Sequence, residues 1–267
     1  MVEITKEQLR QLQLNILDFF SRVCEENNIR YWLEFGSLIG AVRHQGYIPW
    51  DDDIDVGMLR DDYNKLRDIL KDDSGRYVLH DVDNDNQYNF LFPKIYDTRT
   101  IEFDPNAMQE TSVNIDIFIF DSIPSDQKKQ KRFFKKRDIL RRLNDFQVLD
   151  YKRATTKAKR ICSYILKNIL KVFPKNYFIC KANNYIQRYN KIQTKVVGNT
   201  TGYMKIAYDV DKIYNTIIVP FEDRFYRIPE EFDYLLTLRY GDYMQLPPVE
   251  KRIPAHQEIK AYFLEKA

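Results

Sequence analysis

The acidic residues Asp53, Asp55 and Asp116 have the chemistry and the surroundings of a metal site. Segment 53–58 alternates acidic and apolar residues, which predicts a strand that presents Asp53 and Asp55 on one face. Asp116 lies in the apolar run 113–120, so its carboxylate also projects from an otherwise apolar strand. Neighbouring carboxylates repel each other unless a cation lies between them, and such oxygen ligands suit Mg²⁺ or Mn²⁺. The pattern therefore predicts a metal pair that holds the attacking and leaving oxygens of a phosphoryl transfer.

Gly36 and Ser37 precede these acids and predict a phosphate-binding turn. The aromatic-rich segment 31–35 is expected to form a short strand, and a helix is expected to begin near Leu38. A turn at the start of a helix offers backbone N–H groups to an anion, and the Ser37 hydroxyl adds a donor. Gly36 lets the backbone approach a ligand closely because it has no side chain.

The acidic run 51–55 allows other interpretations. It could be a solvated loop, although the apolar Ile54 and Val56 argue against that. It could also be a calcium loop, but Val56 stands where that motif needs Gly, and Asp62 stands where it needs Glu. Asp116 could be a structural acid at a strand edge.

The elements that must position these residues predict an α/β (α+β) fold. Thr5 and Gln8 match a capping box and are followed by apolar residues at helical spacing, which predicts a helix over 5–27. Other expected elements are a helix over 61–71 capped by Asp61 or Asp62, a turn at 81–85, strands at 89–96, 100–104, 113–120 and near 217–219, and a helix entering at 227–231. Because these elements do not alternate in regular βαβ units, we expect a mixed sheet flanked by helices.

Positive charge is concentrated in the middle of the chain. Residues 128–195 hold half of the 42 Lys and Arg residues but only three of the 39 acidic residues. This bias predicts a basic helical insertion over 126–195, between two core segments at 1–125 and 196–267. Pro174 is expected to break the helices of the insertion.

Within this basic segment, apolar residues from Ile161 to Val172 follow a helical stripe. A basic helix with one apolar face suits an anionic membrane surface, and the alternative is that the stripe packs on the core. Nucleic acid is not expected as a partner, because no recognised binding motif accompanies the charge.

The composition excludes several classes of protein. Apolar residues make up 44% of the chain and charged residues 30%, which is ordinary for a globular protein. The cysteines Cys24, Cys162 and Cys180 are odd in number and far apart, so a disulfide framework or a zinc knuckle is not supported. Neither a signal-peptide pattern nor a long apolar run occurs. We therefore expect a cytoplasmic protein that could attach to the inner face of the cell membrane.

The stretch from Tyr31 to Gly57 resembles the signature of the LicD family, which contains phosphocholine transferases and fukutin-type enzymes. Weaker agreement continues at 92–95, at 114–118 and at 240–248, and agreement is poor over the basic segment. The resemblance implies a nucleotidyltransferase-like fold and transfer of a phospho-substituent from a nucleotide-activated donor such as CDP-choline. It implies an acceptor hydroxyl on a cell-surface glycan or a teichoic-acid-type precursor, which could be linked to a lipid.

Carried onto this sequence, the resemblance makes Asp53 and Asp55 the metal-binding pair and Gly36-Ser37 the phosphate-binding turn. Asp116 takes the third acidic position and is the candidate general base. Alternatives that stay open are a nucleotidyltransferase acting on a small molecule and a catalytically inactive glycan-binding module. The transferred group is equally open among choline, ethanolamine, ribitol and sugar phosphates.

Further candidate substrate-binding residues are Glu34, Arg43, His44, Trp50, Lys94 and Asp242. Lys94 could pair with donor phosphates or point to water from an edge strand. His44 could orient a carboxylate or make a structural hydrogen bond, and Trp50 could stack on the donor or pack the loop. Asp242 could bind the acceptor or cap a helix, and His256 could reach the site. The tyrosines and Trp50 could also form an aromatic box for a quaternary ammonium.

Overall fold

The computed structural model describes residues 1–103, 111–148, 156–192, 194–254 and 259–264. Its strands are β1 (Val2–Glu3), β2 (Trp32–Leu33), β3 (Asp55–Leu59), β4 (Tyr77–His80), β5 (Lys94–Asp97), β6 (Thr100–Phe103), β7 (Asn114–Ser122), β8 (Val196–Asn199), β9 (Ala207–Asp209), β10 (Thr216–Phe221), β11 (Arg224–Pro229) and β12 (Lys260–Phe263). Its helices are α1 (Lys6–Glu26), α2 (Phe35–His44), α3 (Arg60–Leu70), α4 (Gln127–Val148), α5 (Lys157–Leu170), α6 (Tyr177–Ile186), α7 (Asp211–Tyr214) and α8 (Phe232–Tyr240), with 3₁₀ helices at Gln187–Ile192 and Val249–Lys251.

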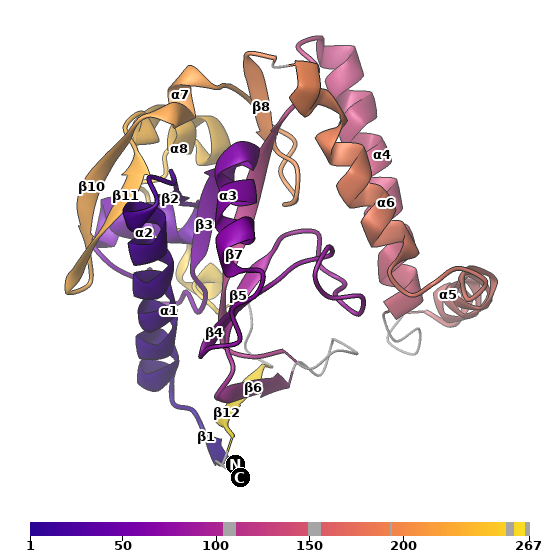
Figure 1. Ribbon diagram of the computed structural model, residues 1–267, viewed down its shortest axis with the longest axis horizontal. Coiled ribbons are helices and arrows are strands. Elements are labelled where there is room, and N and C mark those ends of the chain that lie inside the picture. Colours follow the sequence, from indigo (N-terminus) through magenta and orange to yellow (C-terminus); the bar gives the residue numbers. More distant parts are fainter. Residues whose placement is uncertain (104–110, 149–155, 193, 255–258, 265–267) are drawn as a thin grey trace.

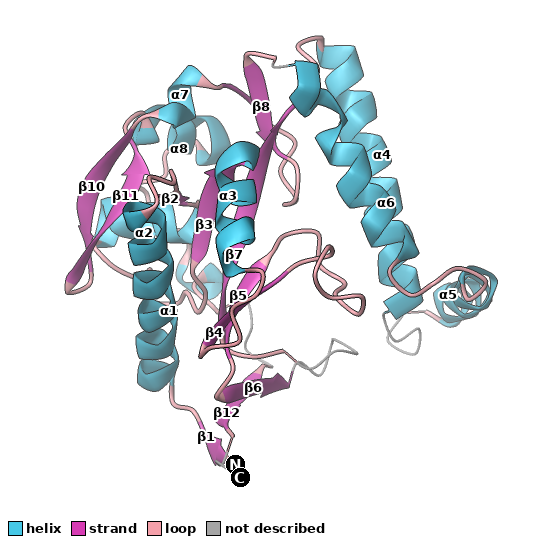
Figure 2. Ribbon diagram, in the orientation of Figure 1, coloured by secondary structure: helices cyan, strands magenta, loops and turns pink. Residues whose placement is uncertain are grey.

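The centre of the molecule is a mixed sheet, as the sequence predicts (Figure 2). Its strands run in the order β2-β3-β7-β5-β4, and β8 and β9 extend it from β7. Strands β3 and β7 are parallel, whereas the other pairs of the sheet are antiparallel. Helix α1 packs on β5 and β7, and α3 packs on β3 and β7 (Figure 1). The two parallel strands therefore form the centre of the core.

Helix α1 confirms the capping box. The Thr5 hydroxyl accepts a hydrogen bond from the backbone N–H of Gln8 at 3.3 Å, and the Gln8 side chain accepts one from the N–H of Thr5 at 2.9 Å. Its buried face, which includes Leu12, Ile16 and Phe20, packs in the main apolar core. The amphipathic pattern thus predicted both the helix and its buried side.

Other expected boundaries differ in the structure. Helix α2 begins at Phe35 and not near Leu38, so Gly36 and Ser37 lie in its first turn. Helix α3 has Leu59 at its N-cap, and neither Asp61 nor Asp62 caps it; both lie in its first turn.

Segment 224–229 is a strand and not the start of a helix, because it forms a hairpin with β10. That pairing buries Tyr226 and Ile228 in the main core, and α8 begins only at Phe232. Strands β4 and β12 were not expected, and the turn at 81–85 is confirmed.

A second, small sheet joins the two ends of the chain. Strand β12 lies between β1 and β6, with Glu3 opposite Tyr262 and Phe103 opposite Lys260. Figure 1 accordingly shows β1 and β12 side by side.

The basic segment leaves the core sheet at the end of β7 and returns on β8, which pairs with the same end of β7. Helices α4 and α6 lie side by side, and their own apolar cluster includes Phe133, Phe134 and Ile179. Helix α5 lies at the far end of this pair (Figure 1). A segment that begins and ends beside one strand has the geometry of an insertion, although the boundaries 126 and 195 stay a prediction.

Candidate active site

Two acids stand side by side at the start of the parallel strand pair. Strands β3 and β7 place Asp55 opposite Asp116 in register, and the N–H of Asp116 donates to the carbonyl of Ile54 at 2.9 Å. The Asp55 residue is only 7% exposed. The adjacency arises because the parallel pairing of these two core strands begins at Asp55 and Asp116.

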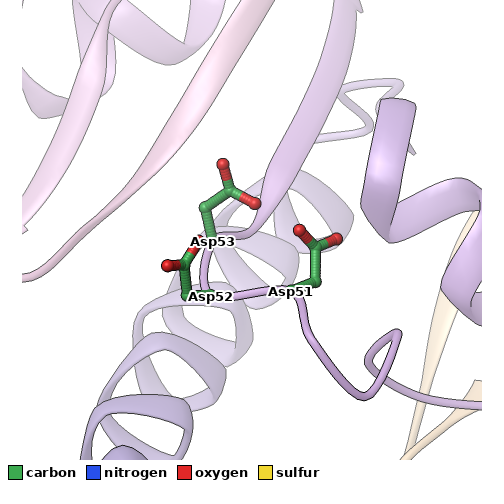
Figure 3. A group of neighbouring side chains, drawn as sticks. All are labelled: Asp51, Asp52 and Asp53. Carbon is green, nitrogen blue, oxygen red and sulfur yellow. The ribbon is translucent and has the colours of Figure 1, made fainter. Parts of the chain in front are cut away.

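The loop before β3 carries three further carboxylates, shown in Figure 3. Oxygen atoms of Asp51, Asp52 and Asp53 all lie within 4.8 Å of one another, which is close enough to share one cation. Helix α1 holds this loop through its backbone, because Arg10 donates to the carbonyl of Asp51 at 3.1 Å and Gln13 to that of Asp52 at 2.9 Å. Asp53 belongs to this tight group, whereas Asp55 and Asp116 lie outside it.

Gly36 and Ser37 lie against the acids. A Cβ atom on Gly36 would lie 2.3 Å from Oδ2 of Asp51, so only glycine leaves room for that carboxylate. The Ser37 hydroxyl accepts a hydrogen bond from the backbone N–H of Asp55 at 2.9 Å. In the structure the two residues therefore position acidic groups, and their binding of phosphate stays a prediction.

Lys94 extends the row of polar residues across the sheet. It lies opposite Asp116 in the β5–β7 register, and its Nζ is 2.5 Å from Oδ1 of Asp116. Nζ also donates to Oδ1 of Asn114 at 2.9 Å. Lys94 thus points to the acids and not to bulk water.

These groups line one cavity of about 700 Å³. Of the residues predicted from the sequence, the cavity brings together Asp53, Asp55, Asp116 and Lys94. Its aromatic wall consists of Phe35, Phe90, Phe92, Phe118 and Tyr203. The two ends of the chain complete its lining with residues 3–6 and 259–261.

Four phenylalanines of this wall were not singled out from the sequence. Phe35 and Phe92 both contact Phe118, with ring centroids 4.7 and 5.0 Å away, and Phe90 lies 5.7 Å from Phe92. They come from three distant segments of the chain, so no local pattern connects them.

The electrostatics of the cavity favour a bound cation. Burial raises the pKa of Asp55 well above its usual value, and the neighbouring carboxylates of Asp53 and Asp116 raise it further. A divalent cation would reverse this effect, because it neutralises the repulsion between the acids. The donor set consists of carboxylate oxygens, which are the ligands that Mg²⁺ prefers. The residues present therefore fit a Mg²⁺ or Mn²⁺ site.

Glu34 lies in a buried ion pair. Its Oε1 is 2.5 Å from the guanidinium of Arg239 in α8, and its Oε2 accepts from the indole N–H of Trp32 at 2.7 Å. Neither partner of the ion pair is exposed, and burial raises the pKa of Glu34 despite the positive charge of Arg239. This arrangement connects α8 to the start of α2, and it leaves Glu34 outside the cavity lining.

The remaining predicted residues form a separate group near the C-terminal end of α2. Arg43 donates to the carbonyl of Tyr243 at 2.6 Å and to His44 at 3.0 Å. Burial and the charge of Arg43 lower the pKa of His44, whose ring lies 6.5 Å from that of Trp50. Their described contacts bind the segment after α8 to the core.

Asp242 lies exposed in the segment after α8 and accepts from the backbone N–H of Gln245 at 3.3 Å. His256 lies outside the described residues. Neither residue adds a described group to the cavity.

Comparison with known proteins assigns the class. Residues 28–158 match the family model described as "LicD/FKTN/FKRP, nucleotidyltransferase domain". This range contains β3, β5 and β7, with the acids and Lys94. The part of the mixed sheet from β2 to β7, with its acids, thus lies in the range that matches a nucleotidyltransferase domain.

A full-length relative narrows the class to a family. The lipopolysaccharide cholinephosphotransferase LicD of Haemophilus influenzae is 33% identical over 273 residues, covering 99% of this chain and 100% of the relative. The mouse ribitol 5-phosphate transferase FKRP is 43% identical over 56 residues, which are 21% of this chain and 11% of the relative. An uncharacterised protein of Rickettsia prowazekii is 58% identical over 45 residues, 17% of each chain. The chain belongs to the LicD family and is a transferase enzyme.

Proposed function

We propose that this chain transfers a phospho-substituent, with phosphocholine as the first candidate, from a nucleotide-diphosphate donor to a sugar hydroxyl of a glycan. The observation that carries the proposal is the register of Asp55 with Asp116 at the edge of a cavity that also contains Asp53 and Lys94. The relatives support it, because one is named a cholinephosphotransferase and another a ribitol 5-phosphate transferase. CDP-choline is the donor to test first.

The residues of the cavity have separate tasks in this proposal. Asp53 and Asp55 would hold Mg²⁺, with Asp51, Asp52 or Asp116 adding oxygen ligands. When bound, Mg²⁺ supplies positive charge that offsets the diphosphate of the donor. Lys94, already directed toward the acids, adds charge beside the donor phosphates.

The transfer itself is a displacement at phosphorus. The acceptor oxygen forms a bond to the phosphorus that carries choline, and the bond from that phosphorus to the nucleoside monophosphate breaks. Asp116 accepts the hydroxyl proton, since its carboxylate lines the cavity beside Asp55. The nucleoside monophosphate leaves with the electron pair.

The aromatic wall offers a place for a quaternary ammonium group. Cations bind over the faces of aromatic rings, and Phe90 and Phe92 already have the Lys94 ammonium 5.1 and 5.2 Å from their centroids. We propose that these phenylalanines take the place of the box expected from Trp50 and the tyrosines. The observation is that they line the acidic cavity and Trp50 does not.

The test is turnover with CDP-choline, Mg²⁺ and lipopolysaccharide as acceptor, measured as release of CMP. Asp53→Asn should lower turnover by at least about a hundredfold, because a ligand to the metal is lost. Asp61→Asn, which changes an exposed acid in the first turn of α3, should leave turnover near that of the wild type. EDTA should abolish the release of CMP by the wild type and by Asp61→Asn.

A folded Asp53→Asn protein with near-normal turnover would exclude the assigned site. The folded state of each variant is checked by circular dichroism and thermal unfolding. If the enzyme turns over CDP-ribitol faster than CDP-choline, the assigned site is retained and the transferred group is ribitol phosphate instead of phosphocholine.

We also propose that the basic segment attaches the enzyme to an anionic membrane surface. The stripe from Ile161 to Val172 does not pack on the core, because Ile161, Tyr164, Ile165 and Ile169 are exposed. Basic residues accompany these side chains on α5 and beside it. Within the part of the chain that the structure describes, no helix combines the length and apolar character that spanning a bilayer requires.

A further inference from the structure

A second cavity lies beside helix α4 and is distinct from the acidic one. Its volume is about 690 Å³, and it lies between one face of α4 and the segment 205–207 that leads into β9. Its lining includes Gln127 and Gln130 at the start of α4. None of the residues assigned to transfer lines this groove, which we call the α4 groove.

The rim of the α4 groove is strongly basic. Lys131, Lys135, Arg142 and Lys205 line it, against a single acid, Asp138. Asp138 already has two close cations, because its oxygens lie 2.7 Å from Lys205 and 2.8 Å from Arg137. Among the described residues, Lys131 and Lys135 have no acidic partner within ion-pair distance. The groove therefore has positive charge that its own acid does not neutralise.

The floor of the groove is apolar. Phe134 is buried, while Ile139 is 47% exposed and Ile206 is partly exposed. A basic rim over an apolar floor is complementary to a ligand with a negatively charged head and an apolar portion. A free inorganic anion would use only the rim.

The α4 groove and the acidic cavity share a wall. Tyr203 and Met204 line the acidic cavity, and the residues that follow them, 205–207, line the α4 groove. Tyr203 is 68% exposed at this junction. Consecutive residues of the segment 203–207 thus line the two cavities.

Helix α4 holds this shared wall in place. Arg137 is fully buried and donates to the carbonyl of Asn199 at 3.1 Å and to that of Met204 at 3.2 Å. The guanidinium of Arg141 lies 3.9 Å from the ring centroid of Tyr203. The basic helix thus fixes the position of the groove relative to the acidic cavity.

We propose that the α4 groove binds the phosphate-bearing, lipid-attached end of the acceptor, while the acceptor hydroxyl reaches the acidic cavity across Tyr203 and Met204. The proposal rests on the proposed transferase function, and it adds the substrate class and the place where the acceptor binds. The basic rim recognises phosphate, and the apolar floor recognises the first part of the attached hydrocarbon chain.

The first experiment measures binding by calorimetry of two probes, farnesyl diphosphate and inorganic diphosphate, to the full chain in EDTA. Without divalent cations the acidic cavity repels both probes, and the variants of α4 separate binding in the groove from binding elsewhere, for instance at α5. Wild-type protein should bind farnesyl diphosphate more tightly than inorganic diphosphate. The double variant Lys131→Glu with Lys135→Glu should weaken both by at least about tenfold, since each basic residue near an anionic ligand adds attraction.

A matched control lies on the same helix. Lys128→Glu with Lys129→Glu makes the same change of charge at exposed positions that do not line the groove. It should leave both affinities close to wild type. Equal weakening by the two double variants, or no binding by the wild type, would overturn the proposal.

Ile139→Asp should remove the preference for farnesyl diphosphate, and an unchanged preference would exclude the apolar floor as a binding surface.

Turnover separates this inference from the proposed function. With lipopolysaccharide as acceptor, the Lys131 and Lys135 variant should raise KM for lipopolysaccharide and leave KM for CDP-choline unchanged. Asp53→Asn should lose turnover yet bind farnesyl diphosphate normally. Wild-type enzyme that is active but does not bind farnesyl diphosphate rejects only the groove. Wild-type protein that binds farnesyl diphosphate but shows no transferase activity rejects the proposed function and the acceptor assignment with it.

Discussion

Two small residues in the first turn of α2 control where the acids of the cavity lie. Gly36 leaves space for the carboxylate of Asp51, and Ser37 accepts from the N–H at which β3 begins. Replacing Gly36 with alanine adds only one methyl group, so the substitution is a sensitive test of this arrangement. The methyl group would meet a side chain and not the backbone.

We predict that Gly36→Ala lowers turnover strongly while the fold persists. The new Cβ would force Asp51 to move, and a displacement of about 1 Å in a catalytic site can lower the rate about a hundredfold. Alanine favours a helix over glycine by about 1 kcal/mol, which offsets part of the crowding. The measurements are CMP release and the midpoint of thermal unfolding.

Gly40, one turn further along α2, gives the contrasting control. A Cβ there would lie 2.4 Å from the backbone carbonyl of Gly46, which cannot rotate away. Gly40→Ala should therefore lower the unfolding midpoint, whereas Gly36→Ala should not. Normal turnover in Gly36→Ala would show that the position of Asp51 is unimportant for transfer.

Individual residues were predictable to different degrees. The alternation over 53–58 predicted one strand that carries Asp53 and Asp55, but β3 begins at Asp55 and Asp53 lies in the loop before it. Both residues nevertheless line the acidic cavity. Nothing near Glu34 indicated its ion pair, because its partner Arg239 lies in the distant helix α8. The direction of Lys94 was also undecided, since it depends on the register of β5 with β7.

At the scale of elements, a buried acid connects the two strands at the edge of the central sheet. Asp97 ends β5 and is fully buried, and its Oδ2 lies 2.8 Å from Arg76, just before β4, and 3.1 Å from Arg99. Burial alone would raise the pKa of Asp97, but hydrogen bonds from the two arginines outweigh it and lower the pKa. The ion pairs of Asp97 thus stabilise one end of the antiparallel pair β4–β5.

This cluster predicts a pH dependence of stability. An acid whose pKa is lowered in the folded state stabilises that state above its unfolded pKa of about 3.9. The contribution is lost as pH falls through the lower, folded-state pKa. Asp97→Asn should therefore be less stable than wild type at neutral pH, by about 1 to 3 kcal/mol, with the difference shrinking in acid.

Urea unfolding of wild type and Asp97→Asn at neutral pH and near pH 3 measures this difference. The exposed Asp72→Asn serves as the control and should show little difference at either pH. A gap between wild type and Asp97→Asn that stays constant with pH would contradict the assigned charge interaction.

Elements were predictable where one periodic pattern covered them. The helix at 5–27 and the strand at 113–120 appeared close to their expected positions, because each buries a continuous apolar face. Hairpin β10–β11 was only half expected, since its second strand depends on a partner and contains Pro229 at its end. The start of α2 was missed because Phe35 enters the helix with a positive φ of 44°, which favours glycine and has no signature here.

At the scale of the whole molecule, helix α5 exposes several large apolar side chains, among them Ile161, Ile165 and Ile169. Its exposed apolar side chains and basic neighbours predict binding to anionic vesicles. Ile165→Asp should weaken that binding about tenfold or more, because burying an isoleucine side chain contributes about 1.5 to 3 kcal/mol. Sedimentation with phosphatidylcholine vesicles, with and without phosphatidylglycerol, measures it.

Ile218→Asp on β10 is the matched control, since Ile218 is 57% exposed and Ile165 is 52% exposed. It should sediment with anionic vesicles as the wild type does. Equal binding of wild-type protein to neutral and anionic vesicles would end the membrane proposal.

The fold class was predictable from the sequence, but the way distant segments come together around the acidic cavity was not. Charge bias located the basic helices, and motif density located the acids. The cavity, however, is assembled from segments at 3–6, 90–94, 203–204 and 259–261, which the sequence gives no reason to bring together. Long-range contacts of this kind depend on the complete packing of the chain and not on local propensity.

The small sheet that joins β1, β12 and β6 has a practical consequence for anyone who purifies this enzyme. Glu3 and Lys6 line the acidic cavity, so an affinity tag on the first residues would lie beside it. Kinetic constants are best measured after such a tag has been cleaved, and labels for fluorescence work belong at exposed residues outside the cavity lining, for instance at the tip of the β10–β11 hairpin.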